Sequence, residues 1–140
     1  MSGPPPALQA SPRILHTALF AGALFMAPMT ALLRWIAPIV HVGAGTATVL
    51  RFVAIATLMA QAVVVRIVRN RIEPLPPGGD EDAWWNAFLT PCLVIWGLGE
   101  SLTILGSVFF FLTGDWLMLG VAAGGLVLLF LANPTRLMRD

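Results

Sequence analysis

Residues 84–112 read WWNAFLTPCLVIWGLGESLTILGSVFFFL, and only one of these side chains, Glu100, carries a charge. A helix rises about 1.5 Å per residue, so about 20 apolar residues cross the roughly 30 Å of hydrocarbon in a bilayer. This segment is long enough to cross with residues to spare. The sequence therefore predicts a transmembrane helix over residues 84–112.

Three further apolar runs lie on either side of this segment. They cover residues 14–33, 45–65 and 116–131, and each is bounded by prolines, glycines or charged residues. The first run contains Pro28, which a membrane helix tolerates because neighbouring groups satisfy the freed carbonyl. We therefore expect an all-α integral membrane protein, in which residues 14–132 form one domain, a four-helix bundle.

The composition supports a membrane location. Apolar residues make up 58% of the 140-residue chain and charged residues only 11%, against about 25% charged residues in ordinary soluble domains. A chain of this size lacks the interior volume to bury so much apolar surface, so the excess must face lipid. The net charge of +1 gives no dense basic surface for phosphate contacts, which argues against a nucleic-acid partner.

The segments outside the apolar runs are rich in proline and charged residues. Residues 1–13 predict a disordered tail, residues 73–79 a linker that no helix crosses, and residues 133–140 a second tail. A cleaved signal peptide ending near residues 27–31 is the alternative interpretation of the first run. It fits less well, because Arg13 is the only charged residue before that run.

The arginines indicate the orientation. With four spans, both tails and the linker share one side of the membrane. Six of the eight arginines lie on that side: Arg13, Arg66, Arg69, Arg71, Arg136 and Arg139. The other side holds only Arg34 and Arg51. Because basic residues accumulate in cytoplasmic segments, we expect both termini in the cytoplasm.

Glu100 needs an explanation, because it lies about twelve residues, or ~18 Å, inside its predicted helix. A charged side chain near the bilayer centre costs at least ~2.5–3.5 kcal/mol and by default marks a functional site. One interpretation is ion or proton binding, with Thr103 and Ser107 on the same helix face as hydrogen-bonding partners. The other is a buried ion pair with Arg51, which would neutralise both groups and fix the register of two helices.

Small residues indicate where helices are expected to pack. Gly97 lies three residues before the membrane carboxylate, and Gly120 and Gly124 form a small-xxx-small pattern in the last apolar run. Glycines at such positions let two helices approach closely. Trp96 and Cys92 are expected in the core, and Cys92, as the single cysteine, forms no internal disulfide.

Residues 99–109, which read GESLTILGSVF, resemble the carboxylate helix of the rotary ATPase proteolipids (subunit c). In that family a membrane Glu is followed by small and aliphatic residues and then a Gly. The preceding helix here opens with GAGTAT at residues 43–48, and a basic loop leads into the Glu helix, as in that family's hairpin. The resemblance implies that Glu100 carries a proton or a sodium ion in a ring of subunits. The chain also resembles small four-span proteins encoded in bacterial genomes, which implies the bacterial inner membrane.

No catalytic or metal-binding set accompanies these features. His16 and His41 fall at opposite ends of the first span, so they cannot bind one haem or metal ion. No Ser–His–Asp or Cys–His set is apparent, and we expect neither enzyme activity nor a cofactor. The expected function is that of an accessory or structural subunit, which packs in lipid against other membrane subunits or copies of itself. The alternative is an oligomeric ion-coupled transporter, or a proteolipid-like ion carrier that uses Glu100.

Overall fold

The structure is a computed structural model that describes residues 12–37 and 42–139. Within these residues all regular secondary structure is helical, as the sequence predicted. The helices are α1 (Pro12–Ile36), α2 (Ala44–Arg69), α3 (Glu81–Thr113), α4 (Trp116–Leu131) and α5 (Pro134–Leu137). Nearly all of the expected tail over residues 1–13 lies outside the described residues, and so does His41.

Three helices are long and apolar enough to cross a bilayer, namely α1 with 25 residues, α2 with 26 and α3 with 33. This finding confirms the prediction of apolar helices of membrane-spanning length. The fourth predicted span forms α4, which is apolar throughout but has only 16 residues. α2 ends at Arg69 rather than at residue 65, because arginines near a helix C-terminus interact favourably with the helix dipole.

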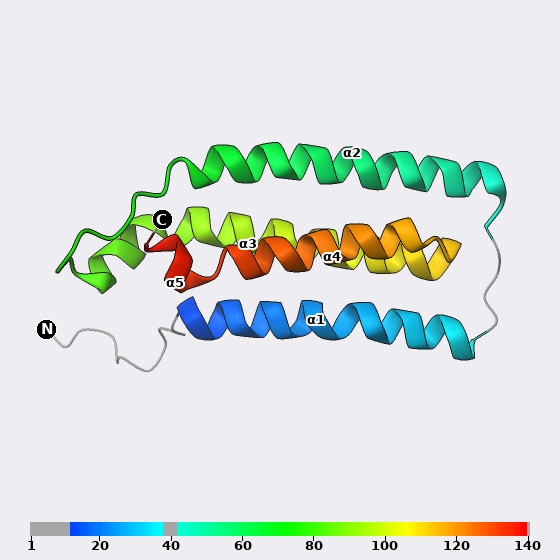
Figure 1. Ribbon diagram of the computed structural model, residues 1–140, viewed down its shortest axis with the longest axis horizontal. Coiled ribbons are helices and arrows are strands. Elements are labelled where there is room, and N and C mark those ends of the chain that lie inside the picture. The colour runs from blue at the N-terminus through cyan, green and yellow to red at the C-terminus, as the bar shows by residue number, and fades with distance from the viewer. Residues whose placement is uncertain (1–11, 38–41, 140) are drawn as a thin grey trace, which may run out of the picture.

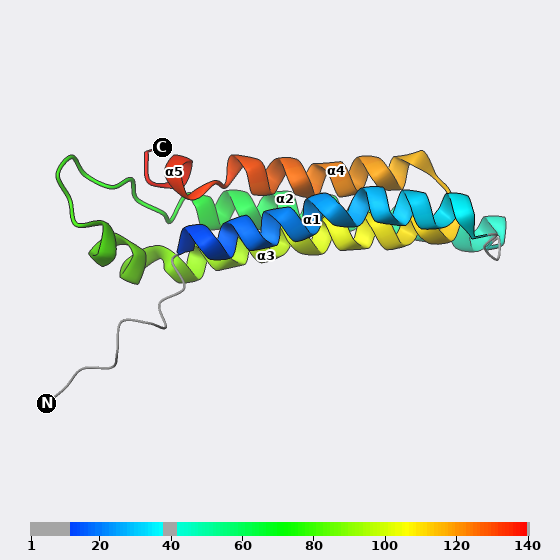
Figure 2. The same ribbon diagram turned by 90° about the horizontal axis from the view of Figure 1, so that it is seen from below.

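α3 and α4 lie side by side, and α1 and α2 flank this pair on opposite sides (Figure 1). Seen from below, α1 lies in front of the α3–α4 pair and contacts both helices (Figure 2). α3 contributes more buried residues than any other helix, at spacings of three and four residues that repeat on one helix face. From the middle of α3 onward these residues are Cys92, Ile95, Trp96, Gly99, Leu102, Thr103, Gly106, Ser107 and Phe110. The outer faces of α1 and α2 remain apolar and uncovered, which suits contact with lipid.

A tight turn joins α3 to α4. Gly114 adopts φ +68°, a left-handed conformation that glycine reaches without steric cost. Asp115 then caps α4, because its carboxylate accepts the backbone N–H of Leu117 at 3.1 Å. Arg34, near the end of α1, donates to the carbonyl of Phe111 at 2.6 Å and fixes α1 to this turn.

The opposite end of the molecule is more ordered than the sequence indicates. Residues 133–140 were expected to be only a tail, but they contain α5, whose Leu137 is buried. Asn133 caps α5 by accepting a backbone N–H of its first turn at 3.0 Å. The carbonyl of Met138 accepts the N–H of Leu75 at 2.8 Å. The C-terminal segment and the linker therefore hold each other in place.

Candidate functional site around Glu100

Glu100 lies near the middle of α3. The residue is partly buried, and its carboxylate has no hydrogen bond or ion pair with any residue that the structure describes. Hydrocarbon cannot replace the lost hydration of a carboxylate. Within the described chain, no group compensates the carboxylate of Glu100.

The structure gives Arg51 a different partner from the predicted one. Its Nε lies 2.5 Å from Oδ2 of Asp115, so the expected pair with Glu100 does not form. Arg51 follows the start of α2 by seven residues, and this end of α2 lies beside the α3–α4 turn. Asp115 is therefore nearer in depth than Glu100. The sequence analysis considered only Glu100 as a partner for Arg51, on the basis of depth.

The environment of Asp115 favours its charged form. The backbone N–H of Leu117 lowers the pKa of this carboxyl below its ordinary value of 3.8, and Arg51 lowers it further, while partial burial opposes both. The Arg51 side of the pair is open, with 53% of its side chain exposed, whereas 17% of the Asp115 side chain is exposed. Exposed pairs of this kind contribute about 0.2–1 kcal/mol.

Thr103 and Ser107 do not hydrogen-bond to Glu100 in the described part of the chain. The hydroxyl of Thr103 is directed instead at the α3–α4 contact, where it lies 3.1 Å from the carbonyl of Gly99 and 3.2 Å from that of Ala122. The hydroxyl of Ser107 is buried without a partner among the described atoms. Both residues therefore belong to the core of the molecule rather than to the surroundings of the carboxylate.

The close contact between α3 and α4 depends on glycines other than those predicted. A Cβ on Gly106 would lie 2.6 Å from the carbonyl oxygen of Met118. A Cβ on Gly125 would lie 2.7 Å from the backbone nitrogen of Thr103, and one on Gly99 would also be too close to its neighbours. These backbones approach so closely that only glycine fits.

The predicted packing glycines have smaller roles. Gly97 and Gly120 have open space where a Cβ would be, so they lie at no close helix contact in this chain. Gly124 would make ordinary van der Waals contact with Leu58 of α2, at 3.6 Å. The close contact of α4 therefore lies at Gly125, and the predicted pair Gly120 and Gly124 makes no such contact with the described residues.

Sequence reasoning missed a buried polar contact that joins three helices. His16 of α1 is buried, and its Nε2 donates to the carbonyl of Leu129 in α4 at 2.9 Å. The ring of His16 packs edge-on against Trp96 of α3, with centroids 5.1 Å apart. Trp96 in turn donates to the carbonyl of Ala132 at 2.8 Å, in the core position that the sequence predicted. The combination of a histidine and a deep tryptophan was the only signal for this contact.

The same contact locates Glu100. Glu100 follows Trp96 by one helical turn, so the two residues share a face of α3. Because Trp96 packs against His16, this face is the one beside α1. On the other side of α3, Ser101 accepts a hydrogen bond from the Gln61 amide of α2 at 3.1 Å. Polar groups therefore occur at mid-length on both flanks of α3.

Nothing in this geometry forms a metal centre. Within residues 12–37 and 42–139, no three His, Cys, Asp or Glu side chains gather closely enough to hold a metal ion.

No protein-family model, curated protein or solved structure matches this chain. The chemistry of its function therefore has to be argued from the residues described above. Glu100 is the carboxyl group near the middle of α3, and the described residues leave it without a partner, while Arg51 and Asp115 satisfy each other.

Proposed function

We propose that this protein is a non-catalytic accessory subunit of a larger membrane complex, located in a bacterial inner membrane. The observation that supports the proposal is the partly exposed carboxyl group of Glu100, at mid-length of α3, without a partner in its own described chain. Lipid tails offer no hydrogen bonds, whereas a polar side chain on a neighbouring helix does. A second subunit, or a second copy of this chain, would supply that group.

The polar groups on the other flank of α3 support the same proposal. Ser101 is exposed, and Gln61 donates to it while its own carbonyl oxygen, Oε1, is buried without a partner among the described atoms. Amide and hydroxyl groups at membrane depth commonly form hydrogen bonds between helices. Together with Glu100 they give the chain two polar positions at which a partner helix is able to pack.

The proposal includes four spans with both termini in the cytoplasm. The apolar α4 runs back along α3, which supports a fourth crossing of the membrane (Figure 1). The start of α1, the linker and α5 share one end of the molecule, and that end carries six arginines. The other end carries only Arg34 and Arg51, and each end has one arginine in an ion pair, Arg13 with Glu81 and Arg51 with Asp115. The positive-inside rule then favours cytoplasmic termini. A reporter fused after Asp140 that is active only in the periplasm would contradict this orientation.

Gentle detergent extraction, followed by mass determination of the intact particle, tests the subunit role. We expect the wild-type chain to copurify in fixed stoichiometry with another membrane protein. Glu100→Gln, which keeps shape but removes the charged state, should weaken that association, and Glu100→Leu should abolish it. Ile104→Leu is the matched control, because Ile104 is exposed one turn further along α3. Purification of a wild-type monomer from its native membrane would contradict the proposal.

A second candidate function is that of an oligomeric proton or ion carrier. The likeness of residues 99–109 to the rotary ATPase proteolipid helix implies this role, and the position of Arg51 is compatible with it. A carrier carboxylate must gain and release its ion, which a permanent arginine partner would prevent. Because Arg51 binds Asp115, Glu100 has no such permanent partner in the described chain.

Proton flux into vesicles distinguishes the two roles. A carrier loses flux in Glu100→Gln and retains part of it in Glu100→Asp, while the oligomer itself persists. An accessory subunit shows no flux in any variant, and its partner dissociates when Glu100 is replaced.

A further inference from the structure

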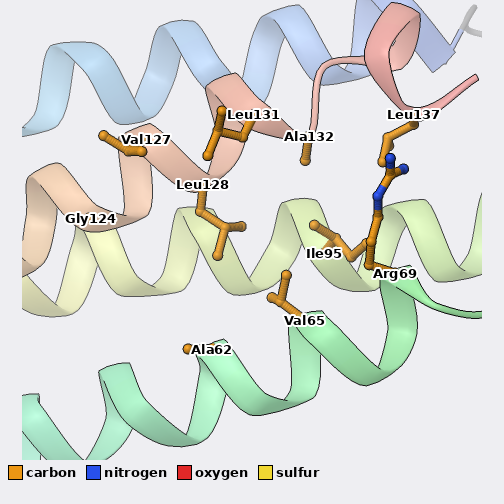
Figure 3. Close-up of a pocket in the computed structure, with 10 residues that line it drawn as sticks. All are labelled: Ala62, Val65, Arg69, Ile95, Gly124, Val127, Leu128, Leu131, Ala132 and Leu137. Atoms are coloured by element: carbon orange, nitrogen blue, oxygen red, sulfur yellow. The ribbon is translucent and has the colours of Figure 1, made fainter. Parts of the chain in front are cut away.

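An open groove of about 350 Å³ lies between α2 and α4, toward the end of the molecule that carries the linker and α5 (Figure 3). Its walls are almost entirely apolar. Val65 of α2, Ile95 of α3, and Leu128 and Leu131 of α4 contribute to them. Ligand sites in proteins commonly have this size and this apolar lining, with a few polar groups placed at one point.

The polar group of this groove is Arg69, at the C-terminal end of α2. Figure 3 shows its side chain extending from α2 toward Leu137 of α5. One guanidinium nitrogen, Nη1, is buried and has no hydrogen-bond partner among the described atoms. A buried charged donor without an acceptor is costly, because it has lost its water and gained nothing in exchange. An anionic acceptor at this end of the groove would remove that cost.

We infer that the groove binds one anionic phospholipid. The acyl chain lies along the apolar walls, and the phosphate accepts hydrogen bonds from Arg69. The surrounding charge fits this ligand, since Arg66 and Arg136 are exposed and form no ion pair within the described chain. Basic pockets between membrane helices, at the level of the headgroups, bind anionic lipids in this way.

The shape of the groove favours a lipid over a free phosphate ion. Arg69 lies at the last residue of α2, where headgroups are expected, and the rest of the groove runs toward the middle of the helices. Val127 and Leu131 are both exposed, so the groove opens sideways on the surface that would face the bilayer. A free phosphate would contact Arg69 and leave the apolar walls unused. A phospholipid uses both parts.

Native mass spectrometry of the full-length chain in detergent tests this inference. The chain is titrated with phosphatidylglycerol and with phosphatidylcholine of the same acyl composition. We expect one phosphatidylglycerol to bind at least about tenfold more tightly, the preference expected from a charge-assisted hydrogen bond. Arg69→Gln should remove the preference. Arg71→Gln is the matched control, because it removes the same charge from an exposed residue outside the groove.

A second pair of variants tests the apolar part without touching the charge. Val127→Trp fills the groove from an exposed position and should reduce binding of both lipids. Val63→Trp places the same side chain on the exposed surface of α2, away from the groove, and should leave binding unchanged. These variants keep the inference testable even if replacement of Arg69 prevents folding.

Three results would overturn the inference: equal affinity for the two lipids, an equal loss in Arg71→Gln, or displacement of the lipid by inorganic phosphate at similar concentration. The inference requires a bilayer but does not depend on Glu100. Glu100→Gln should bind phosphatidylglycerol like the wild type, so failure of the subunit proposal and failure of this one are distinguishable.

Discussion

Arg51 and Asp115 connect α2 to the turn between α3 and α4, with 2.5 Å between Nε and Oδ2. The other carboxylate oxygen of Asp115 accepts the N–H of Leu117 and caps α4. One side chain therefore begins a helix and holds a neighbouring helix at the same time. This matters for α2 because Ala54 is the only residue of that helix that is buried.

Replacement of Asp115 should cost more stability than replacement of Arg51. Asp115→Ala removes a helix cap worth about 1 kcal/mol together with an exposed ion pair worth about 0.2–1 kcal/mol. Arg51→Met removes only the ion pair and keeps the apolar stem of the side chain. Denaturant unfolding in detergent measures both free energies, and equal losses for the two variants would contradict the dual role of Asp115.

The contribution of Asp115 should depend on pH in a defined direction. Because folding lowers the pKa of its carboxyl, the charged form stabilises the folded state. That stabilisation is fully present above the ordinary value of 3.8 and is lost as the pH falls through the lower folded-state value. Thermal unfolding between pH 6 and pH 2 measures it. Asp115→Asn lacks the titrating group, so its melting temperature should fall less over the acidic part of the range.

A double-mutant cycle between Arg51 and Glu100 should show no coupling. Residues without shared partners have additive effects within about 0.3–0.5 kcal/mol. We expect Arg51→Met and Glu100→Gln to add in this way, whereas Arg51→Met and Asp115→Asn should not. An interaction energy above 1 kcal/mol between Arg51 and Glu100 would mean that the two residues pair in the membrane after all.

Two glycine substitutions of the same kind should have opposite effects. Gly106→Ala places a Cβ 2.6 Å from the carbonyl oxygen of Met118, so two helix backbones have to separate. Overpacking of this kind costs about 1–3 kcal/mol. Gly120→Ala meets no atom within 4 Å, and it should stabilise α4 by up to about 1 kcal/mol through helix propensity. Unfolding free energies of the two variants provide the comparison.

The helices were predictable because bilayer thickness sets the length of an apolar run, and tertiary contacts do not enter that argument. The 84–112 and 116–131 runs lie within α3 and α4 for this reason. The end of α1 and the presence of α5 were harder to predict from the sequence. α5 depends on burial of Leu137 against distant residues, and no local periodicity reveals that contact.

The site was predictable only in part. The depth of a residue along its helix does not determine which neighbouring residue its side chain contacts. Depth alone allowed Arg51 to reach either Glu100 or Asp115. Arg51 pairs with Asp115 because the start of α2 lies beside the α3–α4 turn. The glycines show the same limit. Neighbouring residues on a helix point about 100° apart, so Gly124 and Gly125 face different neighbours, and only the position of α3 determines which one must be glycine.

The lengths of the central helices differ enough to affect the bilayer itself. The 16 residues of α4 rise about 24 Å, and the 33 residues of α3 rise about 50 Å. In the proposed four-span arrangement, hydrocarbon about 30 Å thick exceeds the first length and falls short even of the ~44 Å rise of the apolar run 84–112 within α3, so hydrophobic mismatch has opposite signs on adjacent helices. On the side of α4, lipids are expected to compress toward the protein. Another short transmembrane helix would deform an already thinned bilayer at a lower free-energy cost. Membrane thinning would therefore favour association of such helices with the α4 side of the protein.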